Sequence, residues 1–271
     1  MPAARCSRLV ATAATVAVLS LAGCDGDGAA ESAETSSPSP PPSKSGATPT
    51  GSPSEVAGPL SEQQARAALL AEGNLPAGWR HADLADAAPA GAAPEELRTD
   101  DRNCRQLFDV LRGDADTHEA RTAASRGYRG SADGPYLSSE VASYDSEGGD
   151  GSKRALSTFR SVRASCRTFT AENDAVTVDF TVSRLKAGPG GDSACARLRG
   201  TARGGPADGQ QLTLDLVLSR VKQSTTGVAL LSTGDGDTGL ARRAARAAAE
   251  RLKEVTAGRT PSPTVPPEQD D

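Results

Sequence analysis

The chain has 271 residues, a formal net charge of −5, and only 3% aromatic residues. Its acidic residues are in excess mainly near the ends, since residues 25–59 and 259–271 together hold eight acidic and two basic residues. The part between them is close to neutral. This argues against a nucleic acid partner, because nucleic-acid-binding domains carry a basic patch or stripe. At roughly 200 residues, this middle part has the usual size of one domain.

The N-terminus has the pattern of a bacterial lipoprotein leader. Arg5 and Arg8 precede an apolar run over 9–19, which is too short to span a bilayer as a permanent helix. The run leads to the sequence Leu21-Ala22-Gly23-Cys24, in which small residues precede a cysteine. We therefore expect residues 1–23 to be a signal peptide that is removed.

Cys24 is then the lipid attachment site and the first residue of the mature protein. A diacylglyceryl group provides two acyl chains, and two chains hold a protein stably at a membrane. The predicted location is the extracytoplasmic face of the cell membrane. An ordinary cleaved secretory peptide is the alternative. A twin-arginine route is not favoured, because Arg5 and Arg8 are not adjacent.

Two segments have the composition of disordered chain. Residues 24–59 contain seven prolines among Ser, Thr, Gly and Ala, and residues 257–271 contain four prolines and an acidic end. Such segments bury too little apolar surface to offset the entropy of ordering. We predict a disordered linker at 24–59, which would hold the domain away from the membrane, and a disordered tail at 257–271.

Residues 60–256 are predicted to form an α+β domain. Amphipathic periodicity predicts four helices. The first begins after Ser61, and the other three cover 101–112, 153–169 and 240–255. Period-two patterns and turn residues predict seven strands, near 79–83, 120–129, 136–144, 176–182, 195–203, 212–218 and 228–231. Strands joined by tight turns, such as 131–135, indicate a mostly antiparallel sheet.

Two of these helices have recognisable start signals. Ser61 and Gln64 fit a capping box. Residues 235–239 resemble the start of a calcium loop, but Leu240 and Arg246 stand where that loop needs glycine and glutamate. We interpret 235–239 as a turn in which Asp237 or Thr238 caps the last helix.

Three cysteines remain for the folded domain: Cys104, Cys166 and Cys195. An envelope location permits disulfides, and three cysteines allow one bridge in three ways. Cys104 and Cys166 both lie on the apolar stripes of predicted helices, so we favour that pair and expect Cys195 to be a free buried thiol. A Cys166–Cys195 bridge is the alternative.

The sequence contains no recognisable catalytic or metal-binding motif. His81 and His118, the two histidines, lack zinc-ligand spacing with the scattered cysteines, and we expect both at the surface. No Gly-x-Ser-x-Gly elbow is present, and the Gly148–Gly151 cluster lacks the Gly-Lys-Ser/Thr of a phosphate-binding loop. We therefore expect no metal, no cofactor and no enzymatic activity.

Aromatic residues are scarce, so few are available to line a ligand groove. Trp79, Tyr128 and Tyr136 are candidates for lining a ligand groove, together with Tyr144. With so few aromatic residues in the chain, packing in the core is the favoured interpretation for all four.

Several short motifs resemble those of one family. They are Leu75-Pro-Ala-Gly-Trp79, Cys104-Arg-Gln-Leu-Phe108, Val141-Ala-Ser-Tyr144, Ala155-Leu with Phe159 and Cys166-Arg-Thr-Phe169, and Gly191-Asp-Ser193. They resemble actinobacterial lipoproteins similar to the extracellular sensor domain of PknH-type kinases. The resemblance implies a Mog1/PsbP-like α/β/α sandwich with a central antiparallel sheet, a ligand cleft and no catalysis. It also favours the Cys104–Cys166 pairing, because both cysteines fall at motif positions.

The resulting hypothesis is a membrane-anchored binding or sensing module, whose ligand is a cell-wall component, a small molecule or a partner protein. The alternatives are a structural or accessory envelope protein that acts through protein contacts, and a hydrolase with a dispersed site. The sequence predicts no particular ligand and no oligomeric state.

Overall fold

The computed structural model describes residues 55–83, 98–114, 119–145, 150–173, 176–185, 192–205 and 207–263. The predicted signal peptide, Cys24, His118 and the glycines at 148 and 149 lie outside the described residues. Residues 188–191, between the strands predicted at 176–182 and 195–203, also lie outside them.

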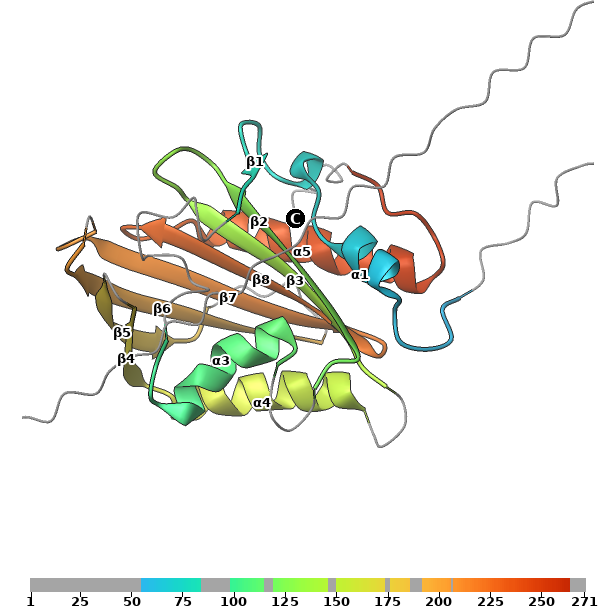
Figure 1. The fold of residues 1–271 in the computed structure, drawn as a ribbon, viewed down its shortest axis with the longest axis horizontal. Coiled ribbons are helices and arrows are strands. Elements are labelled where there is room, and N and C mark those ends of the chain that lie inside the picture. The colour runs from blue at the N-terminus through green and yellow to red at the C-terminus, as the bar shows by residue number, and fades with distance from the viewer. Residues whose placement is uncertain are drawn as a thin grey trace, which may run out of the picture. The chain divides into compact units, whose positions relative to one another are not determined.

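The described residues form one antiparallel sheet of eight strands in the order β1-β2-β3-β8-β7-β6-β5-β4 (Figure 1). The strands are β1 (Arg80–His81), β2 (Thr122–Arg129), β3 (Tyr136–Ser143), β4 (Thr168–Glu172), β5 (Thr177–Ser183), β6 (Ser193–Arg203), β7 (Gln211–Val221) and β8 (Ser224–Thr233). The helices are α1 (Glu62–Ala68), α3 (Arg102–Arg112), α4 (Gly151–Ser165) and α5 (Thr238–Thr256), with a short 3-10 turn, η1 (Glu72–Asn74). The α+β class is therefore confirmed.

Two pairs of helices contact the sheet through alternate strand residues. Leu214 and Leu216 of β7 belong to the buried cluster that contains α3 and α4, whereas Val217 belongs to the cluster that contains α5. Successive strand residues point to opposite faces, so the two clusters lie on different faces of β7. Figure 1 shows α3 and α4 side by side below the sheet, and α1 contacts α5 as well as β2 and β3.

One face of the sheet is partly open to solvent. In β5 the buried residues Val178, Phe180 and Val182 face the cluster of α3 and α4. The two residues between them, Asp179 and Thr181, are exposed. The predicted alternation of this strand is confirmed, with one dry and one wet face.

The predicted helix over 153–169 is too long. α4 ends at Ser165, Cys166 has an extended backbone (φ −77°, ψ 107°), and the chain continues as β4. Phe169 is buried in β4, and it packs against Phe180 of β5 with the ring centroids 5.5 Å apart. Phe169 fits both a helical spacing from Cys166 and a strand spacing to Ala171, and pairing with β5 decides the conformation.

Two other boundaries also differ from the prediction. The strand predicted at 79–83 has only two residues, β1. β8 begins at Ser224, four residues before the predicted start. Its first residues are buried despite their hydroxyl groups, because those groups find partners: Ser224 Oγ lies 2.9 Å from Ser143 Oγ, and Thr226 Oγ1 donates to the Glu140 carbonyl.

The capping predictions are confirmed. Ser61 and Gln64 form the reciprocal capping box of α1. Asp237 caps α5 by accepting a hydrogen bond from the Leu240 amide at 2.9 Å. α1 is short and ends at Ala68.

The folded domain extends a few residues beyond the predicted boundaries at 60 and 256. The Val56 amide donates to the Thr256 carbonyl at 3.1 Å. At the other end, the Ser262 carbonyl accepts a hydrogen bond from Arg251 at 2.8 Å. Both contacts tie residues of the predicted linker and tail to the C-terminal part of α5.

Candidate functional site

A pocket of about 580 Å³ opens at the end of the sheet where β3 and β7 begin and β8 ends. Its lining comes from three turns and the strand ends beside them: Asp133, Pro135, Tyr136, Ala207, Gln210, Gln211, Leu212, Leu231, Ser232, Thr233 and Gly234. We call it the Tyr136 pocket. Its size falls in the range of small-molecule sites, which is roughly 300–1,000 Å³.

The apolar wall of the Tyr136 pocket comes from three adjacent strands. Tyr136 of β3 pairs with Leu231 of β8, and Leu212 of β7 pairs with Thr233, two residues further along β8. Tyr136, Leu212 and Leu231 are at least 96% buried and belong to the cluster of α3 and α4. Because they lie in paired strands, these side chains are held by the sheet itself.

The rim of the Tyr136 pocket is polar. Asp133, Gln210, Gln211 and Thr233 are exposed, and Ser232 is half-buried. Amide and hydroxyl groups both donate and accept hydrogen bonds. The pocket thus combines an apolar wall with polar groups around it, as ligand sites usually do.

Tyr136 is fixed in place by the turn before it. Its hydroxyl donates to the Ala132 carbonyl at 3.0 Å. Burial raises the pKa of Tyr136, Asp133 adds to the increase, and Arg129 opposes it. Gly134 has φ +93°, and a Cβ there would lie 2.8 Å from the Tyr136 ring. Only glycine therefore fits this close approach.

The predicted groove of Trp79, Tyr128 and Tyr136 is not formed, because these side chains lie on different faces of the sheet. Trp79 and Tyr128 are buried in the cluster with α5, whereas Tyr136 is buried in the cluster with α3 and α4. The hairpin register is the reason: Tyr128 pairs with Leu137, while Tyr136 pairs with Arg129. Cross-strand partners share a face, so the two tyrosines point in opposite directions.

The other predicted groove residues have structural contacts. The Tyr128 hydroxyl donates to the Leu70 carbonyl after α1, and burial raises the pKa of Tyr128. Tyr144 is buried with the α4 cluster, and burial likewise raises its pKa. Sequence reasoning thus identified one residue of the Tyr136 pocket and missed its other lining residues.

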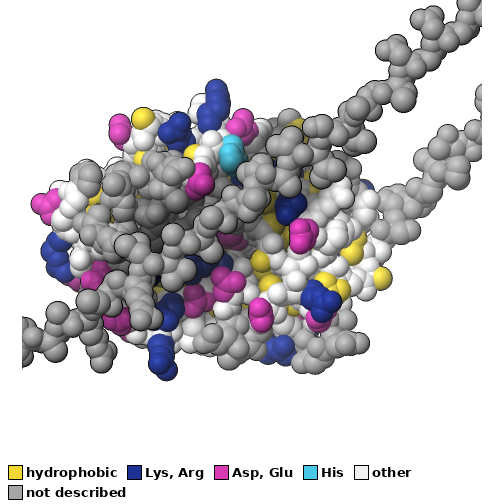
Figure 2. All heavy atoms as spheres, in the orientation of Figure 1, with side chains coloured by type: hydrophobic (Ala, Val, Ile, Leu, Met, Phe, Trp, Pro, Cys, Tyr) yellow, Lys and Arg dark blue, Asp and Glu magenta, His cyan; other side chains and the backbone are white. Residues whose placement is uncertain are grey.

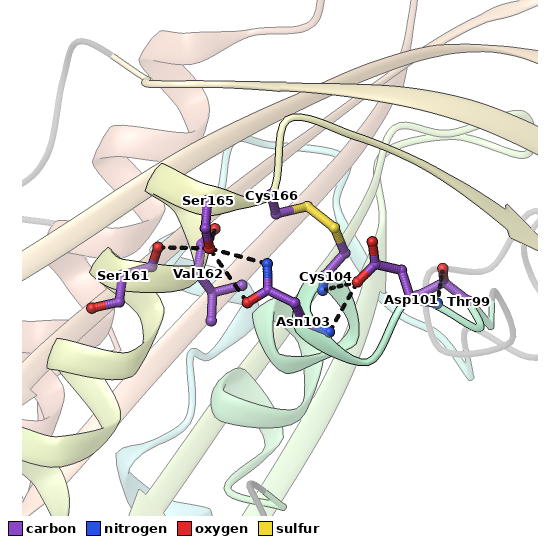
Figure 3. The surroundings of a disulfide bond; sticks show 8 residues. All are labelled: Thr99, Asp101, Asn103, Cys104, Ser161, Val162, Ser165 and Cys166. Carbon is purple, nitrogen blue, oxygen red and sulfur yellow. Dashed lines mark hydrogen bonds between the residues drawn. A yellow bond between two sulfur atoms is a disulfide. The ribbon is translucent and has the colours of Figure 1, made fainter.

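A disulfide joins Cys104 and Cys166, with their Cα atoms 5.3 Å apart (Figure 3). It links the first turn of α3 to the residue after α4. Asp101 caps α3 by accepting hydrogen bonds from the Asn103 and Cys104 amides. The Asn103 side chain donates to Ser165 Oγ at 3.0 Å, so polar contacts accompany the disulfide between the two helices.

Cys195 is a free thiol and is 95% buried. It lies in β6, within the cluster that contains α5. Burial raises the pKa of Cys195 to about 11. The thiolate is the reactive form of cysteine, so this residue packs as a small apolar side chain.

A buried ion pair connects the sheet to the start of α5. Arg197 of β6 donates two hydrogen bonds of 2.6 Å to the carboxylate of Asp215, its cross-strand partner in β7. Arg197 also donates to Thr238 Oγ1 at 2.6 Å. Hydrogen bonding to Asp215 raises the pKa of Arg197. The Asp215 side chain is 99% buried and both of its oxygens accept from Arg197, so the pair joins β6 to β7.

Asp150 caps α4 and has a perturbed pKa. Its carboxylate accepts from the Lys153 amide at 3.1 Å and from Ser152 Oγ at 2.8 Å. Burial by itself would raise the pKa of Asp150, but hydrogen bonds from Lys153 and Ser152 outweigh it and lower the pKa to about 2.

Within the described ranges, no group of three His, Cys, Asp or Glu residues is arranged to hold a metal ion. His81 is exposed, and its ring meets the edge of Tyr128 with the centroids 6.3 Å apart. Among the helices that the structure describes, none is long and apolar enough to cross a membrane.

No protein family model and no curated protein matches the chain. Among solved structures, the chain is similar to the crystal structure of the extracellular domain of PknH from Mycobacterium tuberculosis. The two are 14% identical with a TM-score of 0.49, and the match covers 70% of this chain and 97% of the other. We therefore infer the role of the domain from its own residues.

Proposed function

We propose that the chain is an envelope lipoprotein, anchored by a lipid on Cys24 at the extracytoplasmic face of the cell membrane. Its domain is a non-catalytic α/β/α sandwich that binds a ligand in the Tyr136 pocket. The segment that follows Cys24 acts as a spacer. At roughly 3.1 Å per residue, the 30 residues from Asp25 to Ser54, which precede the described part of the domain, would reach about 90 Å when fully extended.

Two features support the proposed compartment. The leader ends in Leu21-Ala22-Gly23-Cys24, directly after an apolar run of signal-peptide length. The Cys104–Cys166 disulfide suits an oxidising compartment, since disulfides persist outside the cytosol.

The observation that carries the binding role is the Tyr136 pocket. It joins a buried wall of Tyr136, Leu212 and Leu231 to a rim of amides, hydroxyls and one carboxylate. The wall is built on three paired strands and is therefore preformed, which keeps the entropic cost of binding low. On the face seen in Figure 2, acidic and basic side chains are interspersed among the coloured residues, and they form no basic patch of the kind that nucleic-acid-binding domains carry.

The test is a thermal-shift screen of the mature chain, residues 24–271 with Cys24→Ala, against wall muropeptides and single-chain lipids. A ligand at about 100 times its Kd stabilises the folded state by about 2.7 kcal/mol. For a domain of this size, that corresponds to an increase in Tm of roughly 5–10 °C.

Two tryptophan variants locate the effect. Thr233 is an exposed residue of the pocket rim, so Thr233→Trp places an indole over the wall and should abolish the shift. Thr181→Trp is the matched control, because Thr181 is an exposed strand residue that does not line the pocket. If no compound raises Tm, or if Thr233→Trp retains the whole shift, the proposed binding site is wrong.

A further inference from the structure

The described rim of the Tyr136 pocket carries one charged side chain, the carboxylate of Asp133, and no lysine or arginine. We infer that the pocket selects an uncharged single-chain amphiphile over an anionic one of the same length. The inference rests on the proposed function and specifies the ligand class for the same site.

The carboxylate lies close to the apolar wall. Asp133 and Tyr136 line the same pocket, and after burial the charge of Asp133 is a further cause of the raised pKa of Tyr136. Arg129 also acts on Tyr136 with the opposite sign, but it does not line the pocket. A ligand head group at the rim would therefore lie closer to a negative charge than to a positive one.

The other rim groups suit a neutral head group. Within the described part of the chain, the side chains of Gln210 and Thr233 make no hydrogen bond to protein, so they are available to a ligand, whereas Gln211 and Ser232 alternate with Leu212 and Leu231 and point to the other face of the sheet. Amides and hydroxyls can pair with the hydroxyls of a glycerol or a similar head group. A carboxylate or phosphate head would find no cation there, and charged groups need a partner when they leave water.

The apolar part of the ligand would lie against Tyr136, Leu212 and Leu231. These side chains come from neighbouring strands and lie on one face of the sheet, and only their few exposed atoms reach the pocket. A methylene group that is fully removed from water would raise the affinity about fourfold, and the gain per methylene is smaller here because the wall side chains are already at least 96% buried. Affinity should therefore increase with chain length until the pocket of about 580 Å³ is filled.

The experiment is isothermal titration calorimetry of the mature chain (residues 24–271, Cys24→Ala) with two probes, each below its micelle-forming concentration. The probes are 1-monodecanoylglycerol, which is neutral, and decanoate, which is anionic. The interaction between two unit charges about 4 Å apart in water changes a binding constant by roughly a factor of five. We therefore expect the neutral probe to bind at least about fivefold more tightly at low ionic strength.

Charge reversal at the rim tests the cause. Asp133→Lys should move the preference toward decanoate by roughly 25-fold, a factor of five for each of two charge units. Glu119→Lys is the matched control: Glu119 is exposed and outside the pocket lining, and the substitution changes the net charge equally. It should leave the ratio of the two affinities unchanged.

The outcomes separate the two proposals. If both probes bind equally well, or if Asp133→Lys and Glu119→Lys behave alike, the selectivity is refuted while the binding site stands. If neither probe binds, the inference is refuted as well, and the thermal-shift screen decides whether the pocket binds another class of ligand.

Discussion

Removal of the Cys104–Cys166 disulfide should lower the free energy of unfolding by about 4 kcal/mol. The two cysteines are 62 residues apart in sequence. In the chain-entropy model, the bridge restricts the unfolded chain, and a loop of this length corresponds to roughly 14 cal/mol/K, or about 4 kcal/mol at 25 °C. A domain of this kind is stable by roughly 5–15 kcal/mol, so the loss is a large fraction of the total.

The folded state should survive the loss, because the helices keep other contacts. α3 and α4 pack against each other in one buried cluster that includes Leu107 and Phe159. The Asn103–Ser165 hydrogen bond also remains. The expected effect is therefore a shift of the unfolding midpoint without loss of the native circular dichroism spectrum.

The assay is urea unfolding of the mature chain, followed by circular dichroism with and without a phosphine reductant. A Cys195→Ala background prevents exchange with the free thiol. The Cys104→Ala/Cys166→Ala variant is the control, since the reductant should not alter its stability. A difference below about 1 kcal/mol between oxidised and reduced protein, or an equal effect of the reductant on the double variant, would refute the reasoning.

Three further predictions concern other groups. Asp215→Asn removes one partner of a buried pair and leaves Arg197 without its carboxylate, so we expect urea unfolding to show a free energy of unfolding lower by about 3–5 kcal/mol. Asp179→Asn is the control and should have a much smaller effect, because the Asp179 side chain is half exposed. Asp150 has a folded-state pKa of about 2 against a reference value of 3.8, so its stabilising contribution is complete above about pH 4 and is lost as the pH falls through about 2; Asp150→Asn should flatten the pH dependence of stability in that window, and an unchanged slope would contradict the assignment. Cys195, with a pKa raised to about 11 by burial, should react with iodoacetamide at pH 8 only in urea, and rapid labelling of the native chain would contradict its burial.

Local signals in the sequence predicted much of the fold. The Ser61 capping box, the Asp237 cap and the alternation of β5 each depend on residues close together in the chain, so the pattern and the structure agree. The turn at 131–135 likewise predicted the β2–β3 hairpin. These features need no knowledge of the tertiary structure.

The predictions that were wrong concern features that depend on pairing between distant segments. Phe169 and its neighbours became a strand because β5 pairs with them. The polar start of β8 is buried because Ser224 and Thr226 find partners on β3. Propensity alone does not predict either outcome, since tertiary contacts override it.

The candidate site was the least predictable part. The Tyr136 pocket brings together residues near 133, 210 and 232, which no local motif connects. One local signal was available: if residues 129 and 136 pair across the turn, Tyr128 and Tyr136 must point to opposite faces. A second local signal concerned the buried ion pair rather than the pocket. Asp215 lies within the apolar run Leu212–Leu218, and a carboxylate there needs a buried partner.

The central claim is that Cys24 anchors this domain to the outside of the cell membrane. Its most direct test is fractionation of cells that produce the wild-type chain or Cys24→Ala, with the mass of the N-terminal peptide determined for the membrane fraction. We expect wild-type protein to remain with membranes and to begin at a lipid-modified Cys24, and we expect Cys24→Ala to be released from them. Membrane retention of Cys24→Ala, or a wild-type N-terminus without lipid, would contradict it.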